Sequence, residues 1–114
     1  MKSNRREFLM NHIEKTHHDG INELLEAILS LRDLDECRAF MCDLCTVKEL
    51  LSLAQRVQVA KRLMAGDTYD TIRSQIPVSS ATITRVNTAF QFGNGGYRTV
   101  LERLDKAAIS EKEE

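Results

Sequence analysis

The chain has 114 residues, of which 42% are hydrophobic, 29% charged and 5% aromatic, with one proline and no tryptophan. This composition is typical of one small helical globular domain and excludes a disordered chain. No apolar run approaches the roughly 18 residues of a membrane span, and Phe8–Met10 is too short for the core of a secretory signal. We therefore expect a cytoplasmic protein with no membrane association.

The formal net charge is −1, which gives no global sign of nucleic-acid binding, but the charges are unevenly distributed. Residues 56–103 carry seven basic and three acidic side chains, whereas residues 1–55 carry seven basic and ten acidic ones. A positive central segment favours an anionic partner in that part of the chain. An ordinary solvated mixture of charges explains the same counts equally well.

The first half of the chain predicts two helices behind an irregular start. Residues 1–18 are interpreted as a charged N-terminal arm that is partly helical and frayed. Apolar residues then recur at three- and four-residue spacing from Ile21 to Leu29, which predicts a helix from about Gly20 to Arg32. Asp33 or Asp35 offers a break and a cap. A second short helix is indicated by the apolar series Cys37, Phe40, Met41 and Leu44.

Three cysteines, Cys37, Cys42 and Cys45, lie in or beside this second helix. The pair in "CDLC" has the spacing of a metal or redox pair, and three histidines lie upstream. A zinc site usually needs a second ligand pair at a defined spacing, and none follows. Free cysteine packs as a small hydrophobe, so we expect no metal and no cofactor here.

The next helix has the clearest start in the chain. Thr46 and Glu49 stand at capping-box spacing, so that each can satisfy a backbone N–H of the first turn. The apolar period continues from Leu50 to Leu63, and Gly66 supplies a left-handed stop.

Three further helices are expected after this stop. Thr68 can cap a short helix, "YDTIRSQI", which Pro77 prevents from continuing. Ser79 or Ser80 caps a helix that reaches about Phe92. After a "GNGG" turn, apolar spacing predicts a last helix, and residues 110–114 are expected to be a disordered tail. The sequence thus predicts an all-α fold of about six helices without a strand, with its domain at residues 19–109.

Two short helices joined by a turn of three or four residues, the second polar on its outer face, describe a helix-turn-helix. Ile72 and Ile76 can pack against Ile83 and Val86, with Val78 in the turn. The side chains left facing solvent near the start of the second helix are Ser80, Thr82, Thr84, Arg85, Asn87 and Thr88. Hydroxyls, a guanidinium and free helix N–H groups suit bases and phosphates, and small side chains let a helix enter a groove about 12 Å wide. Helix pairs with this apolar pattern are also common as plain core.

The stretch Thr46–Asn87 resembles the Trp repressor superfamily, and most closely its Trp-repressor-like YerC/YecD group. The segments "SLAQRVQVAKRL", "TYDTI" and "SSATITRV" carry the match, which extends over roughly residues 21–104. The resemblance implies an intertwined homodimer of six-helix protomers, whose two helix-turn-helix units read a near-palindromic operator in double-stranded DNA. It favours a sequence-specific transcriptional regulator, expected to be a repressor. The alternative is a dimeric helical protein-interaction module without DNA binding.

An enzyme is not expected, because the chain has no paired carboxylates, glycine-rich phosphate loop or nucleophile–base spacing. By resemblance, the DNA contacts carry over to Tyr69, Arg73, Ser80, Ala81, Thr82, Thr84 and Arg85. Asp70 also falls on a contact position, but it replaces a basic residue. Either specificity or phosphate affinity is therefore expected to differ at Asp70.

The resemblance also implies an effector pocket, made by Thr46, Arg56, Arg85, Val86 and Ala89. In the Trp repressor, tryptophan binds between two arginines, which correspond to Arg56 and Arg85. A glycine that makes room for the indole is Val86 here, and a serine that holds the amino group is Ala89. We expect an effector other than tryptophan, or none. Arg56 can equally be an ordinary ion-pair partner on a helix surface.

Overall fold

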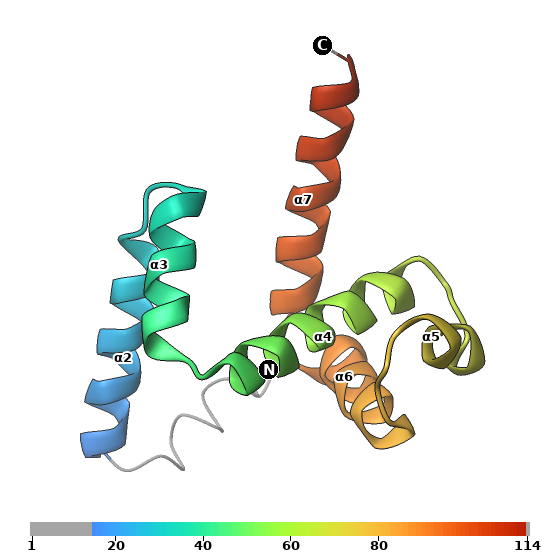
Figure 1. The fold of residues 1–114 in the computed structure, drawn as a ribbon, viewed down its shortest axis with the longest axis horizontal. Helices are drawn as coiled ribbons and strands as arrows, with labels where there is room; N and C mark the ends of the chain where they lie inside the picture. Colours follow the sequence, from blue (N-terminus) through green and yellow to red (C-terminus); the bar gives the residue numbers. More distant parts are fainter. Residues whose placement is uncertain (1–14, 114) are drawn as a thin grey trace, which may run out of the picture. The chain divides into compact units, whose positions relative to one another are not determined.

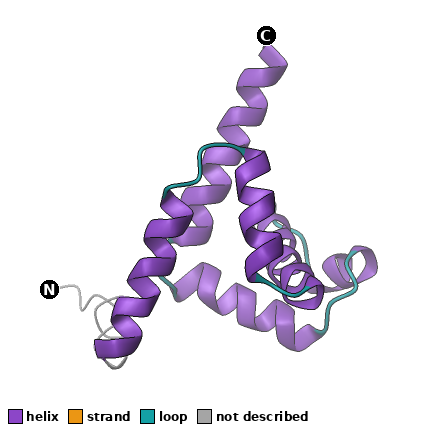
Figure 2. Ribbon diagram, turned by 60° about the vertical axis from the view of Figure 1, so that its left-hand side comes forward, coloured by secondary structure: helices purple, strands orange, loops and turns teal. Residues whose placement is uncertain are grey.

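The protein is all-α, as the sequence predicts. A computed structural model describes residues 15–113, and these form six helices without a strand (Figure 2). In chain order (Figure 1) the helices are α2 (Lys15–Leu29), α3 (Leu34–Leu44), α4 (Val47–Met64), α5 (Tyr69–Gln75), α6 (Ser80–Phe92) and α7 (Gly96–Glu113). None of these helices combines the length and the apolar character that crossing a bilayer requires.

The chain divides into two compact units, Met1–Leu50 and Leu51–Glu114. The first contains α2 and α3, and the second contains α5, α6, α7 and most of α4.

Some helix ends differ from the sequence predictions. Helix α2 begins at Lys15 rather than at about Gly20 and ends at Leu29 rather than at Arg32, so it includes residues 15–18 of the arm that was predicted to be partly helical. Residues 1–14 of that arm lie outside the described residues. No proline interrupts "KTHHDG", and Gly20 inside the helix costs only about 1 kcal/mol relative to alanine. Helix α7 continues to Glu113, so the predicted disordered tail is helical over most of its length. Its last residues are rich in alanine, glutamate and lysine, which are strong helix formers.

Most of the other helix ends lie at the predicted capping residues. Asp33, rather than Asp35, caps α3, and its carboxylate accepts from the Glu36 N–H at 2.8 Å. Thr68 caps α5, and its hydroxyl accepts from the Thr71 N–H at 3.2 Å. Gly66, with φ 91°, makes the left-handed stop after α4 that only glycine adopts without strain.

Thr46 and Glu49 form the capping box at the start of α4. The Thr46 N–H donates to the Glu49 carboxylate at 2.9 Å, and the Glu49 N–H donates to the Thr46 hydroxyl at 3.1 Å. The hydrogen bond from the Thr46 backbone, followed by that from its side chain, lowers the pKa of Glu49 below its ordinary value near 4.5. The carboxylate is therefore held in its charged form, which also suits the positive end of the helix dipole.

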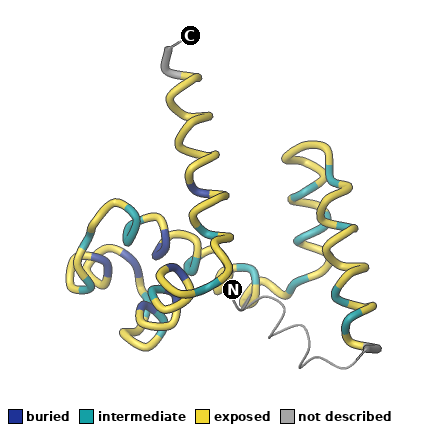
Figure 3. The backbone as a smooth tube through the Cα atoms, turned by 180° about the vertical axis from the view of Figure 1, so that it is seen from behind, coloured by how far each residue is buried: buried dark blue, intermediate teal, exposed yellow. Residues whose placement is uncertain are grey.

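The second unit has a continuous apolar core. Its buried cluster consists of Val59, Ala60, Ile72, Ile76, Ile83, Val86 and Leu101. These residues come from α4, α5, α6 and α7, with Ile76 at the end of α5, so the core joins all four helices of this unit (Figure 3). Phe90 is also buried, and the Arg98 guanidinium lies 4.1 Å from the centroid of its ring.

The described part of the first unit has no such core. Among the described side chains of residues 17–50, none is buried (Figure 3). Helices α2 and α3 are amphipathic, yet their apolar faces remain open: Leu29 is 86% exposed, and Leu25 is 53% exposed. The three cysteines are free thiols, with Cys37 and Cys45 half-buried and Cys42 exposed.

Candidate nucleic-acid interface

Helices α5 and α6 form a tight helix-turn-helix. Only the four residues 76–79 separate them. Pro77 directly follows Ile76, the C-cap of α5, and has no N–H with which to continue the helix. The Val78 N–H donates to the Ile76 carbonyl at 2.8 Å. Ser79, rather than Ser80, caps α6, and its hydroxyl accepts from the Thr82 N–H at 3.1 Å. The turn is thus fixed by local chemistry at both ends.

The inner face of this helix pair is fully apolar. Ile72 and Ile83 are completely buried, and Ile76 and Val86 are nearly so. All four belong to one packed cluster, and Val78 packs against it from the turn. This confirms the predicted apolar pairing and fixes which side of α6 faces outward.

The outer face of α6 is small and polar. Ser80, Ala81, Thr84, Arg85 and Thr88 are exposed, whereas Thr82 is half-buried. On α5, Asp70 and Arg73 are exposed, but Tyr69 is half-buried and packs against the core. The structure therefore brings the predicted DNA-contact residues together on two neighbouring helices, with Tyr69 and Thr82 half-buried and the others exposed.

The hydroxyls on this face differ in whether they already take part in a hydrogen bond within the protein. The Thr82 hydroxyl lies 3.1 Å from the Ser79 hydroxyl, within the cap of α6. The Thr88 hydroxyl donates to the Thr84 carbonyl at 2.9 Å. Within residues 15–113, no hydrogen bond or ion pair involves the Thr84 hydroxyl or the Arg85 guanidinium, so both remain available to a ligand.

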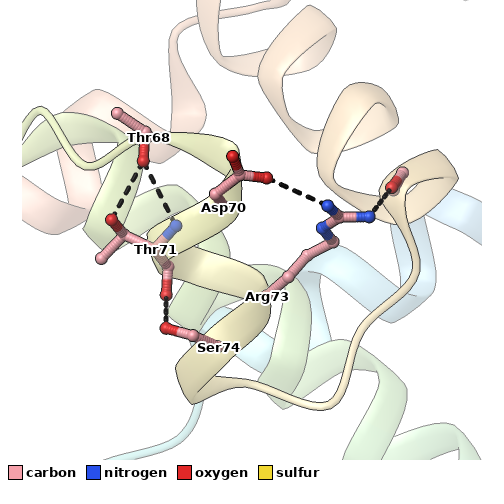
Figure 4. A network of polar contacts seen from close by, with 6 residues as sticks. Thr68, Asp70, Thr71, Arg73 and Ser74 are labelled. Atoms are coloured by element: carbon pink, nitrogen blue, oxygen red, sulfur yellow. Dashed lines mark hydrogen bonds and ion pairs between the residues drawn. The ribbon is translucent and has the colours of Figure 1, made fainter.

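A polar network covers the outer surface of α5 (Figure 4). The Arg73 guanidinium donates to the Asp70 carboxylate at 3.0 Å and, across the turn, to the Ser80 hydroxyl at 2.9 Å. Near the start of α5, the Thr68 and Thr71 hydroxyls lie 2.9 Å apart, and the Ser74 hydroxyl donates to the Thr71 carbonyl at 2.6 Å. The contact between Arg73 and Ser80 spans seven positions, so helical spacing alone could not predict it.

The residues of the predicted effector pocket have different surroundings. Val86 is 2% exposed and is part of the packed core. Arg56 is half-buried and Arg85 exposed. Thr46 belongs to the other compact unit.

Ala89 lines an apolar cavity of about 460 Å³ in the second unit. The other lining residues are Val57, Gly93, Asn94, Gly96, Tyr97, Val100 and Leu101. Neither Arg56 nor Arg85 is among them, so the two cations of the predicted pocket are separate from this cavity.

These features define a helix-turn-helix protein, and comparison with known proteins assigns its family. A sequence model described as Trp repressor protein matches residues 19–105. Uncharacterized protein YerC of Bacillus subtilis (strain 168) is 44% identical over 92 residues, which cover 81% of this chain and 88% of YerC. The chain belongs to the Trp repressor family, and within it to the group that includes YerC.

Two solved structures share the fold at similar identity. The crystal structure of a proposed Trp repressor from Staphylococcus aureus has a TM-score of 0.75 and 46% identity, and the match covers 82% of this chain and 94% of that one. A TrpR-like protein from Eubacterium eligens ATCC 27750 has a TM-score of 0.74 and 45% identity, with 83% of this chain and 95% of that one covered. Both confirm the predicted fold class.

Proposed function

We propose that the protein is a sequence-specific, DNA-binding regulator of transcription that represses genes from a near-palindromic operator. The observation that carries this proposal is the helix pair α5–α6, whose buried apolar face leaves a small, hydroxyl-lined outer face with a free guanidinium at Arg85. Such a face can enter a major groove and meet base edges and phosphates. Membership in the Trp repressor family supports the same reading.

The residues proposed to contact DNA divide by their surroundings. Thr84 and Arg85 are exposed, and their polar groups are available for base edges or the nearest phosphates. Ser80, Ala81 and Thr82 lie in the first turn of α6, where backbone N–H groups without helical partners favour phosphate. Tyr69 and Arg73 approach the same surface from α5.

The protein is proposed to act as a homodimer. A dimer places two copies of α6 one DNA turn apart, which matches a near-palindromic operator. The open apolar faces of α2 and α3 support this assembly, because a monomer rarely leaves such surfaces exposed to water.

The effector is proposed to be a molecule other than tryptophan, or to be absent. The supporting observation is the burial of Val86, whose side chain fills the place where the resemblance requires a glycine. Ala89 offers no hydroxyl to an amino group.

The proposal is tested by selecting bound fragments from a genomic DNA library and measuring affinity for the enriched sequence at several salt concentrations. We expect a motif with two half-sites about one helical turn apart, and an affinity that falls steeply as salt rises. Absence of DNA binding even at low salt would instead favour the helical protein-interaction module. Equal binding to all fragments would leave a DNA-binding protein without an operator.

A further inference from the structure

The bridge formed by Arg73 joins the two helices of the helix-turn-helix. One Nη atom contacts the Asp70 carboxylate on α5, and the other contacts the Ser80 hydroxyl at the first residue of α6. The Asp70 side chain is 89% exposed and that of Arg73 is 50% exposed. Exposed ion pairs contribute little to stability, so the bridge is better explained by what it orients than by what it stabilises.

The planar guanidinium can orient both partners at once. It carries five N–H donors in a fixed fork, and its contacts with Asp70 and Ser80 leave donors free for a phosphate. Lysine keeps the positive charge but has no fork, so it cannot reproduce the same paired geometry.

The bridge also decides how Ser80 can act. A hydroxyl has one donor hydrogen and two acceptor lone pairs, and Arg73 occupies one lone pair of Ser80. The Ser80 hydrogen is therefore directed away from the guanidinium, at an exposed position in the first turn of the second helix. A donor held in this way suits an acceptor on DNA, such as a guanine edge or a phosphate oxygen.

We propose that Asp70 and Arg73 are positioning residues that orient Ser80, and that this Asp70–Arg73–Ser80 relay determines how well the protein distinguishes its operator from other DNA. This inference rests on the proposed DNA-binding function. Asp70 favours the operator over other DNA in two ways. Its carboxylate holds the guanidinium toward Ser80, and its negative charge opposes the attraction of Arg73 to any phosphate backbone.

The test compares variants on the selected operator and on random DNA. Arg73→Lys is expected to leave random-DNA affinity and its salt dependence nearly unchanged, while operator affinity falls on the order of tenfold. Asp70→Ala is expected to raise random-DNA affinity and lower the operator-to-random ratio by a similar factor. Ser80→Ala should lower that ratio too, and the Arg73→Lys, Ser80→Ala double variant should be no worse than either single one.

Helix α3 offers matched controls, because Arg38 and Asp35 form an exposed ion pair at the same three-residue spacing. Arg38→Lys and Asp35→Ala make the same chemical and charge changes on a helix outside the helix-turn-helix, and we expect them to leave the operator-to-random ratio unchanged. Circular dichroism checks that all variants remain folded.

The outcomes separate the relay from the function on which it rests. If the wild-type protein enriches no DNA sequence, the proposed function fails and the relay fails with it. If it enriches an operator on which Arg73→Lys and Asp70→Ala keep the wild-type ratio, the relay alone is overturned. Strictly additive losses in the double variant would show that Arg73 and Ser80 act independently, and would also overturn it.

Discussion

The side chains on the outer face of α6 differ in how far the fold already uses their hydrogen-bonding groups. The Thr82 hydroxyl lies beside that of Ser79 in the helix cap, whereas the Thr84 side chain is exposed and makes no hydrogen bond within the described part of the chain. Loss of the Thr84 hydroxyl should therefore change DNA recognition alone, and loss of the Thr82 hydroxyl should also change the cap.

We expect Thr84→Val, which replaces the hydroxyl by a methyl group of similar size, to weaken operator binding by roughly 1–3 kcal/mol if the hydroxyl reads a base. Affinity for random DNA and the melting temperature should stay within error of the wild type. Thr82→Ala should reduce operator affinity by a similar amount and lower the melting temperature as well. Gel-shift titrations on both DNAs with thermal melts decide this, and an unchanged operator affinity of Thr84→Val would remove Thr84 from the base-reading residues.

The Val86 side chain leads to a second prediction about a single residue, namely that L-tryptophan does not bind. Forcing an indole against a packed side chain costs on the order of 1–3 kcal/mol, and a missing hydrogen bond to the amino group adds about 1 kcal/mol. Together these costs of about 2–4 kcal/mol reduce affinity by roughly thirtyfold to nine-hundredfold.

Calorimetric titration with L-tryptophan should give no binding heat at micromolar concentrations, and operator affinity should not change. Ala89→Ser is the informative control, because it restores the hydroxyl for the amino group but leaves the Val86 side chain in the space that the indole needs. This variant should also fail to bind L-tryptophan. Micromolar binding by the wild type would mean that the core around Val86 opens to admit the ligand.

Individual helices were predictable where their ends carry a specific chemical signal. Asp33, the Thr46–Glu49 pair, Thr68 and Ser79 each place a side-chain acceptor where unpaired backbone N–H groups need one. The start of α2 and the end of α7 carry no such signal, and there the helices extend beyond the predicted bounds. The bridge from Arg73 to Ser80 was missed for another reason: it depends on the exact course of the turn, which no periodicity encodes.

The capping box of α4 gives a pH prediction. The pKa of Glu49 is lowered in the folded protein by its hydrogen bonds to Thr46, so its contribution to stability is complete above the ordinary value near 4.5. That contribution is lost as the pH falls through the lower folded value. Carbon-detected NMR titration should place the Glu49 midpoint below 4.5.

Thr46→Ala should raise the Glu49 midpoint only part of the way back, because the Thr46 N–H, the larger cause, remains available. A Glu49 midpoint at its ordinary value in the wild-type protein would contradict the capping box.

For the molecule as a whole, the sequence indicated more apolar surface than one chain covers, and the structure places that surface. Large exposed apolar side chains lie on α2, α3, α4, α6 and α7 and include Leu25, Leu29, Leu34, Leu44, Val47, Leu51, Phe92, Val100, Leu104 and Ile109. Among the described residues, by contrast, the buried core lies in the second unit. Periodicity identified these apolar faces, but it could not say whether they pack within the chain or between chains, because both choices bury the same residues.

We predict that the open faces are covered by a second copy. Sedimentation at low micromolar concentration should give about 26 kDa, twice the 13.0 kDa of one chain.

In a monomer, Leu25→Lys would replace a half-exposed surface residue and change stability by no more than about 0.5 kcal/mol. In a dimer that buries Leu25, the same change introduces an unpaired charge at the interface and should shift the sedimenting species toward 13.0 kDa, with a lower and concentration-dependent melting temperature. Glu23→Lys, two positions away and therefore on another side of α2, introduces the same side chain as a control and should leave the dimer intact. A folded, monomeric wild-type protein at that concentration would remove the dimer from the proposed function.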